Sequence, residues 1–147
     1  MSHAPELVGA SFQGKGAYGD FEWMVHQDEY KNALFVFNDS ERCMHTCERG
    51  GGNACVRPFN RYGYERNGFG FVRSVGIPTG QSSRGYRNLE EGKVSIDYAL
   101  SILKKTLREH EYDTVFFSEG KGGLIGCGIF DVPYEVRVYI TRSLRNL

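Results

Sequence analysis

Two runs of glycine in this chain of 147 residues stand beside residues that could bind a phosphorylated ligand. The first is the triplet 50–52, which is followed by Asn53 and Arg57. The second is the segment 120–128, in which five of nine residues are glycine. Glycine lets backbone N–H groups approach an anion because no Cβ stands in the path. We therefore interpret both runs as candidate anion cradles, with a flexible loop as the alternative for the triplet.

The second run does not match the common nucleotide-binding motifs. It has neither the Gly-Lys-Ser/Thr ending of a P-loop nor the Gly-x-Gly-x-x-Gly of a Rossmann turn. Both motifs are therefore excluded. Lys121 in this run could contact a phosphate, or it could serve only to keep the loop solvated.

Polar residues follow an apolar run at 33–37, where Asn38, Asp39 and Ser40 come in succession. The carboxyl end of a buried strand is the usual place for ligands in open α/β sheets. Asp39 or Asn53 could orient water against an anomeric carbon, and Asp39 could act as a general base. Capping of the strand end is the alternative interpretation of Asp39.

A second group of reactive side chains, Cys43, His45, Cys47 and Cys55, lies within 13 residues. Thiolates and imidazoles are the usual zinc ligands, but structural sites join ligand pairs from separate segments. We therefore predict no metal and no other cofactor, and interpret the cysteines as free thiols. A Cys and His nucleophile pair stays open, because spacing alone does not show proximity.

The charge is balanced overall but unevenly distributed, with 18 basic and 18 acidic residues. Segment 42–87 holds eight arginines, no lysine and two glutamates, which is a net charge of +6. Arginine suits bidentate contacts to phosphate or carboxylate. The alternative is pairing with the acidic remainder of the chain. Segment 57–73 also combines arginine with aromatic residues, as in single-stranded nucleic acid sites, but it is too short to favour that partner.

The elements that must position these residues follow from hydrophobic patterns. We expect strands at 21–25, 33–37, 71–77, 114–118 and 136–140, a helix over 88–110 and a short terminal helix capped by Thr141. Runs 33–37 and 114–118 are apolar on both faces, which is typical of central strands covered by helices. Residues 1–20 should form an irregular lead-in. The chain is thus predicted to be a single α/β domain over 1–147, in three layers, with a central mixed sheet flanked by helices.

Composition and segment lengths exclude several classes of protein. A content of 40% hydrophobic and 14% aromatic residues supports a packed core and argues against disorder. The apolar runs are far shorter than the ~20 residues that span a bilayer. The first residues have neither the basic nor the apolar region of a signal peptide. We therefore expect a soluble, cytoplasmic protein with no membrane partner.

The order of the motifs resembles the plan of macro domains. The shared features are a strand ending in Asn38, the glycine triplet, the pair Thr79 and Gly80, a long amphipathic helix, and a strand followed by a glycine-rich loop. Over about residues 23–144 the chain is also similar to a group of macro-like proteins from phages and large viruses. These share Phe-Asn-Asp, Gly-Gly-Asn-Ala, Gly-Ile-Pro-Thr-Gly and Gly-x-Gly-Ile-Phe, all of which are present here.

The resemblance implies that ADP-ribose lies in a cleft above the sheet. Asn38 would face the ribose, and Gly51 and Gly52 would lie beside the distal ribose. Gly122, Gly123, Gly126 and Gly128 would surround the diphosphate, and Ile129 and Phe130 would pack near the ligand. The remaining candidate ligand contacts are Asn53, Arg57, Thr79 and Gly80.

The chain departs from the macro pattern in two places. Asn38-Asp39-Ser40-Glu41 stands where macro domains have Asn, two small residues and Asn, and Asp20 is the candidate for the aspartate that holds adenine. We therefore predict binding of ADP-ribose or a related phosphorylated nucleotide or sugar, with hydrolysis of an ADP-ribosyl bond as a candidate activity. An ADP-ribosylated protein is a candidate partner. A non-enzymatic module that sequesters a nucleotide signal or docks a protein is the alternative.

Overall fold

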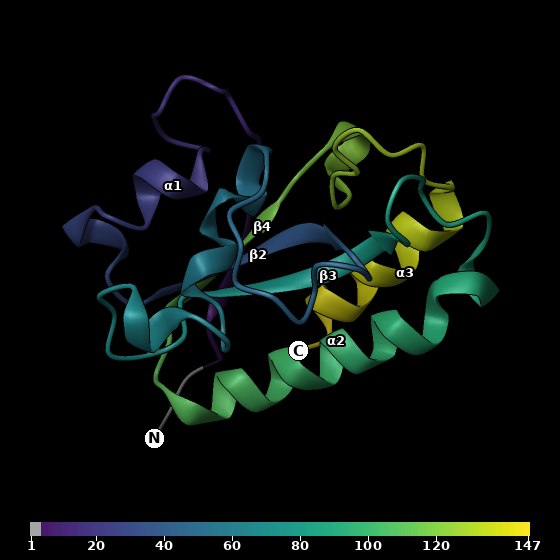
Figure 1. Ribbon diagram of the computed structural model, residues 1–147. Coiled ribbons are helices and arrows are strands. Elements are labelled where there is room, and N and C mark those ends of the chain that lie inside the picture. Colours follow the sequence, from purple (N-terminus) through teal and green to yellow (C-terminus); the bar gives the residue numbers. More distant parts are fainter. Residues whose placement is uncertain (1–3) are drawn as a thin grey trace.

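The computed structural model describes residues 4–147, whose four strands form one sheet in the order β1, β4, β2, β3. The strands are β1 (Glu6–Ala10), β2 (Ala33–Ser40), β3 (Ser74–Gly80) and β4 (Thr114–Ser118). Each neighbouring pair is parallel, so the mixed sheet predicted from the sequence is wrong. The carboxyl ends of all four strands consequently meet at one edge of the sheet (Figure 1).

Helices cover both faces of this sheet (Figure 1). The α-helices are α1 (Phe21–Met24), α2 (Leu89–Glu109) and α3 (Tyr134–Arg145), and the 3₁₀ helices are η1 (Asp28–Tyr30), η2 (Gly52–Phe59), η3 (Tyr64–Arg66) and η4 (Lys121–Gly123). Figure 1 shows α2 and α3 on one side of the sheet and α1 on the other. The result is an α/β arrangement in three layers.

Strand β2 lies between β4 and β3, as its two-faced apolar pattern predicts. Successive side chains of a strand point to opposite faces. Leu34 and Val36 therefore enter the core beneath α2 and α3, while Phe35 and Phe37 enter the core on the α1 side. Both cores need β2, which holds its carboxyl end in a defined position.

Helix α2 confirms the predicted long amphipathic helix. Asn88 caps it by accepting a hydrogen bond from the N–H of Glu91 at 2.9 Å. Its buried face includes Ile96, Leu100 and Leu103, which recur at three and four residues and pack against the sheet.

Two predicted strands are helical instead. Residues 21–25 include α1, where Phe21 and Met24 are buried three positions apart, as on one helical face. Residues 136–140 belong to α3, whose buried Val136, Ile140 and Leu144 recur at four residues. Segments of five residues are too short to distinguish the period of a strand from that of a helix. Thr141 therefore lies inside a helix rather than capping one.

The predicted irregular lead-in contains strand β1, which pairs with β4 at the edge of the sheet. Its few residues include Gly9, and short edge strands give weak sequence signals. The first three residues of the lead-in lie outside the described residues. Strand β3 also differs from its predicted bounds, since it starts at Ser74 and continues through the expected turn to Gly80. No helix within residues 4–147 combines the length and apolar character needed to cross a membrane.

Candidate functional site

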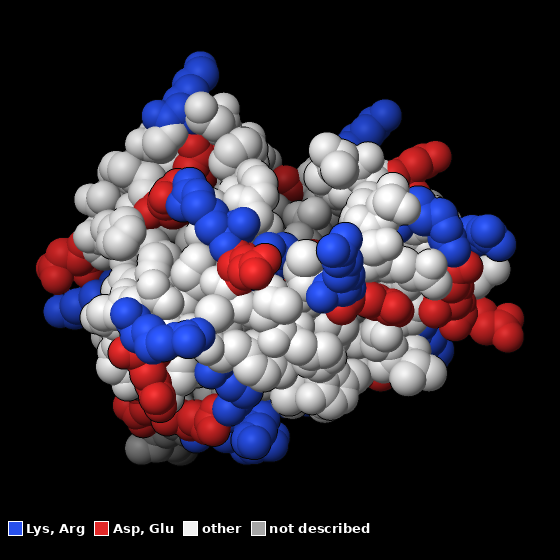
Figure 2. Space-filling view, viewed as in Figure 1, with Lys and Arg blue, Asp and Glu red and all other residues white. Residues whose placement is uncertain are grey.

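The connections after β2 and β4 leave the sheet in opposite directions. The chain after β2 leads to η2, whose Cys55 and Val56 pack into the core on the α1 side. The chain after β4 leads to α3, whose Val136 packs into the other core. Ligands of parallel α/β sheets bind where neighbouring strands diverge in this way. Both glycine runs, which we interpret from the sequence as anion cradles, flank this point. Figure 2 shows a notch in the surface at the upper edge, between the part containing α1 and the part containing residues 119–133.

The side chain of Asn38 faces the second glycine run. A Cβ built on Gly126 would lie 3.6 Å from Asn38 Oδ1, and one built on Gly128 would lie 3.2 Å from Asn38 Nδ2. Gly128 has a φ of +60°, which other residues rarely adopt. Asn38 is half-buried, and within residues 4–147 its amide is neither hydrogen-bonded nor sealed from solvent. An amide that can still donate and accept therefore lies at the divergence point.

The rest of the second glycine run is tied to its own loop and to α3. The N–H of Gly120 donates to Leu124 O at 2.7 Å, and that of Gly126 donates to Ser118 O at 2.8 Å. The N–H of Ile125 donates to Thr141 Oγ1 at 2.9 Å. These bonds shape the loop and occupy the Gly126 donor that a diphosphate would use.

The remaining predicted residues of this loop have different surroundings. Gly122 and Gly123 have positive φ angles and open space where a Cβ would stand. Ile129 is 99% exposed, so its side chain lies in solvent. Phe130 packs over Gly80, where a Cβ would lie 2.9 Å from the Phe130 ring. The structure thus joins Phe130 to Gly80, and the neighbouring Thr79 is fully buried.

Asp39 and Arg57 form a buried ion pair at the carboxyl end of β2, beside the loop that contains the glycine triplet 50–52, which we call the first loop. The side chains are 1% and 8% exposed, and Arg57 Nη2 donates to Asp39 Oδ1 at 2.5 Å. Arg57 Nη1 also donates to Glu48 O at 2.9 Å. A Cβ on Gly50 would lie 2.8 Å from the same nitrogen. Arg57 therefore anchors the segment before the glycine triplet to the end of β2, and neither charge of the pair is free for a ligand.

Asn53 is likewise engaged within the protein. Its Oδ1 accepts a hydrogen bond from the Phe21 N–H at 3.0 Å, and its Nδ2 donates to Ser118 Oγ at 3.2 Å. The residue is 5% exposed. Asn53 thus links α1, η2 and the end of β4, and it helps to hold the first loop beside the sheet.

A cavity of about 440 Å³ lies beside the glycine triplet. Its lining comes from the first loop, the segment before α1 and α1 itself: Phe12, Gly14, Gly16, Asp20, Glu22, Trp23, Arg49, Gly50, Gly51, Gly52 and Cys55. Six of these lining residues had not been predicted from the sequence as site residues: Phe12, Gly14, Gly16, Glu22, Trp23 and Arg49. Only Arg49 had a sequence signal, because it immediately precedes the triplet.

A third glycine-rich loop surrounds the carboxylate of Asp20. The backbone N–H groups of Gln13, Gly14, Lys15 and Gly16 donate to it at 2.5–3.1 Å. Burial raises the pKa of Asp20, but these hydrogen bonds together bring it below its ordinary value. The acceptors of Asp20 are therefore used within the protein, which leaves its predicted contact with adenine without support.

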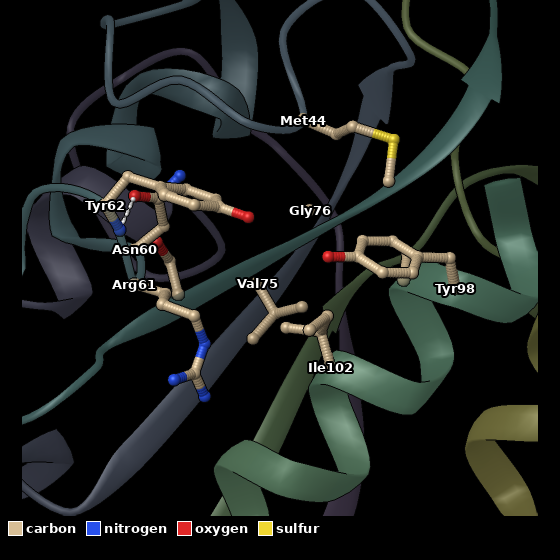
Figure 3. Close-up of a pocket in the computed structure, with 10 residues that line it drawn as sticks. Met44, Asn60, Arg61, Tyr62, Val75, Gly76, Tyr98 and Ile102 are labelled. Atoms are coloured by element: carbon tan, nitrogen blue, oxygen red, sulfur yellow. Dashed lines mark hydrogen bonds between the residues drawn. The ribbon is translucent and has the colours of Figure 1, made fainter.

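A separate, smaller cavity of about 20 Å³ lies at the start of β3 (Figure 3). Met44 and the rings of Tyr62 and Tyr98 stand around it, with Val75 and Ile102 below (Figure 3). This volume holds about one water molecule. It is too small for a nucleotide.

The cysteine cluster is dispersed in the fold. Cys55 is buried in the core, where burial raises the pKa of its thiol. Cys47 Sγ accepts a hydrogen bond from Arg66, and His45 Nδ1 lies 3.1 Å from the Tyr62 hydroxyl. Among residues 4–147, no three side chains of the metal-ligating acidic, His and Cys types come together.

Five of the eight arginines in segment 42–87 are buried or paired with glutamate. Arg57 and Arg73 are buried. Arg49, Arg61 and Arg84 pair with Glu22, Glu109 and Glu91. Figure 2 accordingly shows basic and acidic side chains interspersed on this face.

Comparisons of the chain with protein-family models, with curated proteins and with solved structures find no match.

Proposed function

We propose that this protein binds ADP-ribose or a related phosphorylated nucleotide at the carboxyl ends of β2 and β4. The observation that carries the proposal is the free amide of Asn38 at the point where the two connections diverge. An amide can donate to and accept from a ribose hydroxyl. The second glycine-rich loop lies directly against this amide, because a Cβ on Gly126 or Gly128 would stand within 3.6 Å of the Asn38 side chain.

The first glycine loop supplies donors for a phosphate. Within residues 4–147, the backbone N–H groups of Gly51 and Gly52 donate no hydrogen bond, and a Cβ on either would meet nothing within 4 Å. Successive free N–H groups form anion-binding concavities. The sugar would thus contact Asn38, and the phosphates would extend toward the triplet.

The macro-like plan is part of the same proposal. The strand ending in Asn38, the glycine triplet, Thr79 with Gly80, α2 and β4 with its glycine-rich loop follow one another along the chain. The parallel sheet brings both glycine-rich loops to the edge where its strands end. This arrangement supports a macro-like cleft.

The engagement of the two predicted catalytic residues favours a binding module over a hydrolase. Asp39 would have to leave a buried ion pair to act as a base, and Asn53 would have to release Phe21 and Ser118 to orient water. Breaking such a buried pair costs about 3–5 kcal/mol. Hydrolysis of an ADP-ribosyl bond is therefore the second candidate function.

Calorimetry with ADP-ribose, AMP, NAD and adenosine tests the proposal. We expect ADP-ribose to bind the wild type, and Asn38→Ala to weaken binding at least about tenfold through loss of hydrogen bonds to the ligand. The melting temperature should change little, because the Asn38 amide has no hydrogen-bond partner among residues 4–147. Asn146→Ala, at the distant end of α3, is the matched control. Absence of binding and of thermal stabilisation by all four compounds at millimolar concentration would contradict the proposal.

A further inference from the structure

We propose that the cavity beside the glycine triplet is an anion subsite, in which Arg49 contacts the phosphate and Glu22 holds Arg49 until the anion displaces it. This inference rests on the proposed function and adds to it the phosphate-binding residue and the internal competitor. The phosphate contact is thereby assigned to Arg49, whereas the sequence predicted Arg57 as a ligand contact.

Arg49 is the arginine beside the triplet that can reach a ligand. Its side chain is 58% exposed and lines the cavity, whereas that of Arg57 is 8% exposed and held by Asp39. A guanidinium presents two parallel donors that match two oxygens of a phosphate or carboxylate. Arg49 already uses this geometry, because it donates from both terminal nitrogens to the carboxylate of Glu22.

The pair between Arg49 and Glu22 joins the two walls of the cavity. Arg49 belongs to the first loop and Glu22 to α1, 27 residues apart. Glu22 is 47% exposed, so water can solvate both charges if the pair opens. Exposed ion pairs contribute little to stability, and a ligand anion can therefore compete for the guanidinium.

The other lining groups leave room and donors for the anion. Gly51 and Gly52 lie on the wall that includes Arg49, and their backbone N–H groups have no hydrogen-bond partner in the described part of the chain, residues 4–147. The Asp20 carboxylate also lines the cavity, but four backbone N–H groups already bind it. Glu22 is thus the carboxylate that competes with the ligand for Arg49.

This competition has a counterintuitive consequence. A guanidinium that binds a phosphate through its two terminal nitrogens has to release Glu22, so part of the binding free energy is used to open the pair. Removing the charge of Glu22 should therefore tighten anion binding, whereas removing Arg49 should weaken it. A merely structural ion pair would affect folding and leave the affinity unchanged.

The test measures binding of ADP-ribose and of inorganic pyrophosphate to wild type, Glu22→Gln and Arg49→Gln by calorimetry at low and moderate salt. We expect Glu22→Gln to bind both probes more tightly, by up to about fivefold, which is the upper limit set by an exposed ion pair. Arg49→Gln should bind both at least about tenfold more weakly and show a reduced salt dependence. Glu109→Gln, which breaks the exposed pair with Arg61, and Arg108→Gln are the matched charge controls.

The outcomes separate this inference from the proposed function. If wild type binds ADP-ribose and neither Glu22→Gln nor Arg49→Gln changes the affinity, the anion subsite is overturned and the nucleotide site stands. If pyrophosphate binding depends on Arg49 while ADP-ribose does not bind, the subsite stands and the nucleotide proposal fails. If neither probe binds wild type or Glu22→Gln, both are overturned. Circular dichroism of each variant shows that the comparison is made between folded proteins.

Discussion

The carboxylate of Asp39 and the guanidinium of Arg57 are paired at the carboxyl end of β2, with Nη2 and Oδ1 2.5 Å apart and both side chains buried. Arg57 also binds the backbone at Glu48, so the pair connects the sheet to the segment that carries the glycine triplet. Two residues predicted to contact substrate and ligand thus bind each other. The pair therefore holds the loop with the glycine triplet in position.

Asp39→Asn should destabilise the protein by about 3–5 kcal/mol, because it leaves the Arg57 guanidinium buried without a countercharge. Urea unfolding measures the change. Glu109→Gln breaks an exposed ion pair and should cost less than about 1 kcal/mol. Equal destabilisation by the two variants would show that the buried pair is not a structural anchor.

Asp39→Asn should lower any turnover of an ADP-ribosylated substrate no more than Arg57→Gln does. Both variants break the same ion pair, and Arg57→Gln also removes the hydrogen bond to Glu48 O, so it should disturb the first loop at least as much. A general base would instead be lost only in Asp39→Asn, since Arg57→Gln leaves the carboxylate in place. Turnover that falls in the first variant and persists in the second would assign proton transfer to Asp39.

Gly128→Ala should weaken ADP-ribose binding while the free energy of unfolding changes by about 1–2 kcal/mol. The methyl group would lie 3.2 Å from Asn38 Nδ2, and the positive φ strains any residue other than glycine. Gly68→Ala is a matched control, because Gly68 also has a positive φ but open space around it. We expect calorimetry to detect weaker binding only in Gly128→Ala. A similar loss in both variants would implicate general strain.

Arg73→Lys should destabilise the fold by about 1.5–3 kcal/mol, the range of hydrogen bonds to a charged group. The buried guanidinium donates to the carbonyls of Ala33, Val25 and Tyr30, and burial lowers its pKa to about 10. An ammonium group cannot reproduce this planar set of donors. Thermal and urea unfolding measure the effect. A variant as stable as wild type would contradict the role of these three hydrogen bonds.

The stability should fall as the pH drops through about 6.5, in part because of His110. Burial lowers the pKa of His110, Arg73 lowers it further, and Glu111 opposes them. The unfolded chain then takes up the proton at a higher pH than the folded protein, so protonation favours unfolding. His110→Phe retains the stacking on Phe71, whose ring centroid is 3.7 Å away, and removes the titration.

Urea unfolding of wild type and His110→Phe at pH 7.5 and 5.5 tests this contribution. We expect His110→Phe to lose less stability between the two pH values than wild type does. His45→Gln, which replaces an exposed histidine, serves as the control and should keep the wild-type dependence. An unchanged dependence in His110→Phe would assign the effect to other groups.

Long or two-faced hydrophobic patterns predicted their elements correctly. Helix α2 and strands β2 and β4 could be recognised because their periods persist over enough residues. Residues 136–140 show the limit, since Val136, Arg137 and Val138 alternate as in a strand. Only the packing of Val136, Ile140 and Leu144 against the sheet makes the helical period visible.

By itself, the sequence determined where the glycine runs stand and which polar residues follow the apolar strands, because composition and periodicity depend on neighbours along the chain. The tertiary structure decided which of these polar side chains already bind another residue of the protein. Asp39 and Arg57 are 18 residues apart, Glu22 and Arg49 are 27 apart, and Asn53 and Ser118 are 65 apart. Charge and hydrogen-bond pairing depend on distances in space, which folding sets between remote segments. For this reason Arg49 and Asn38, rather than Arg57 and Asp39, are the side chains that a ligand can reach.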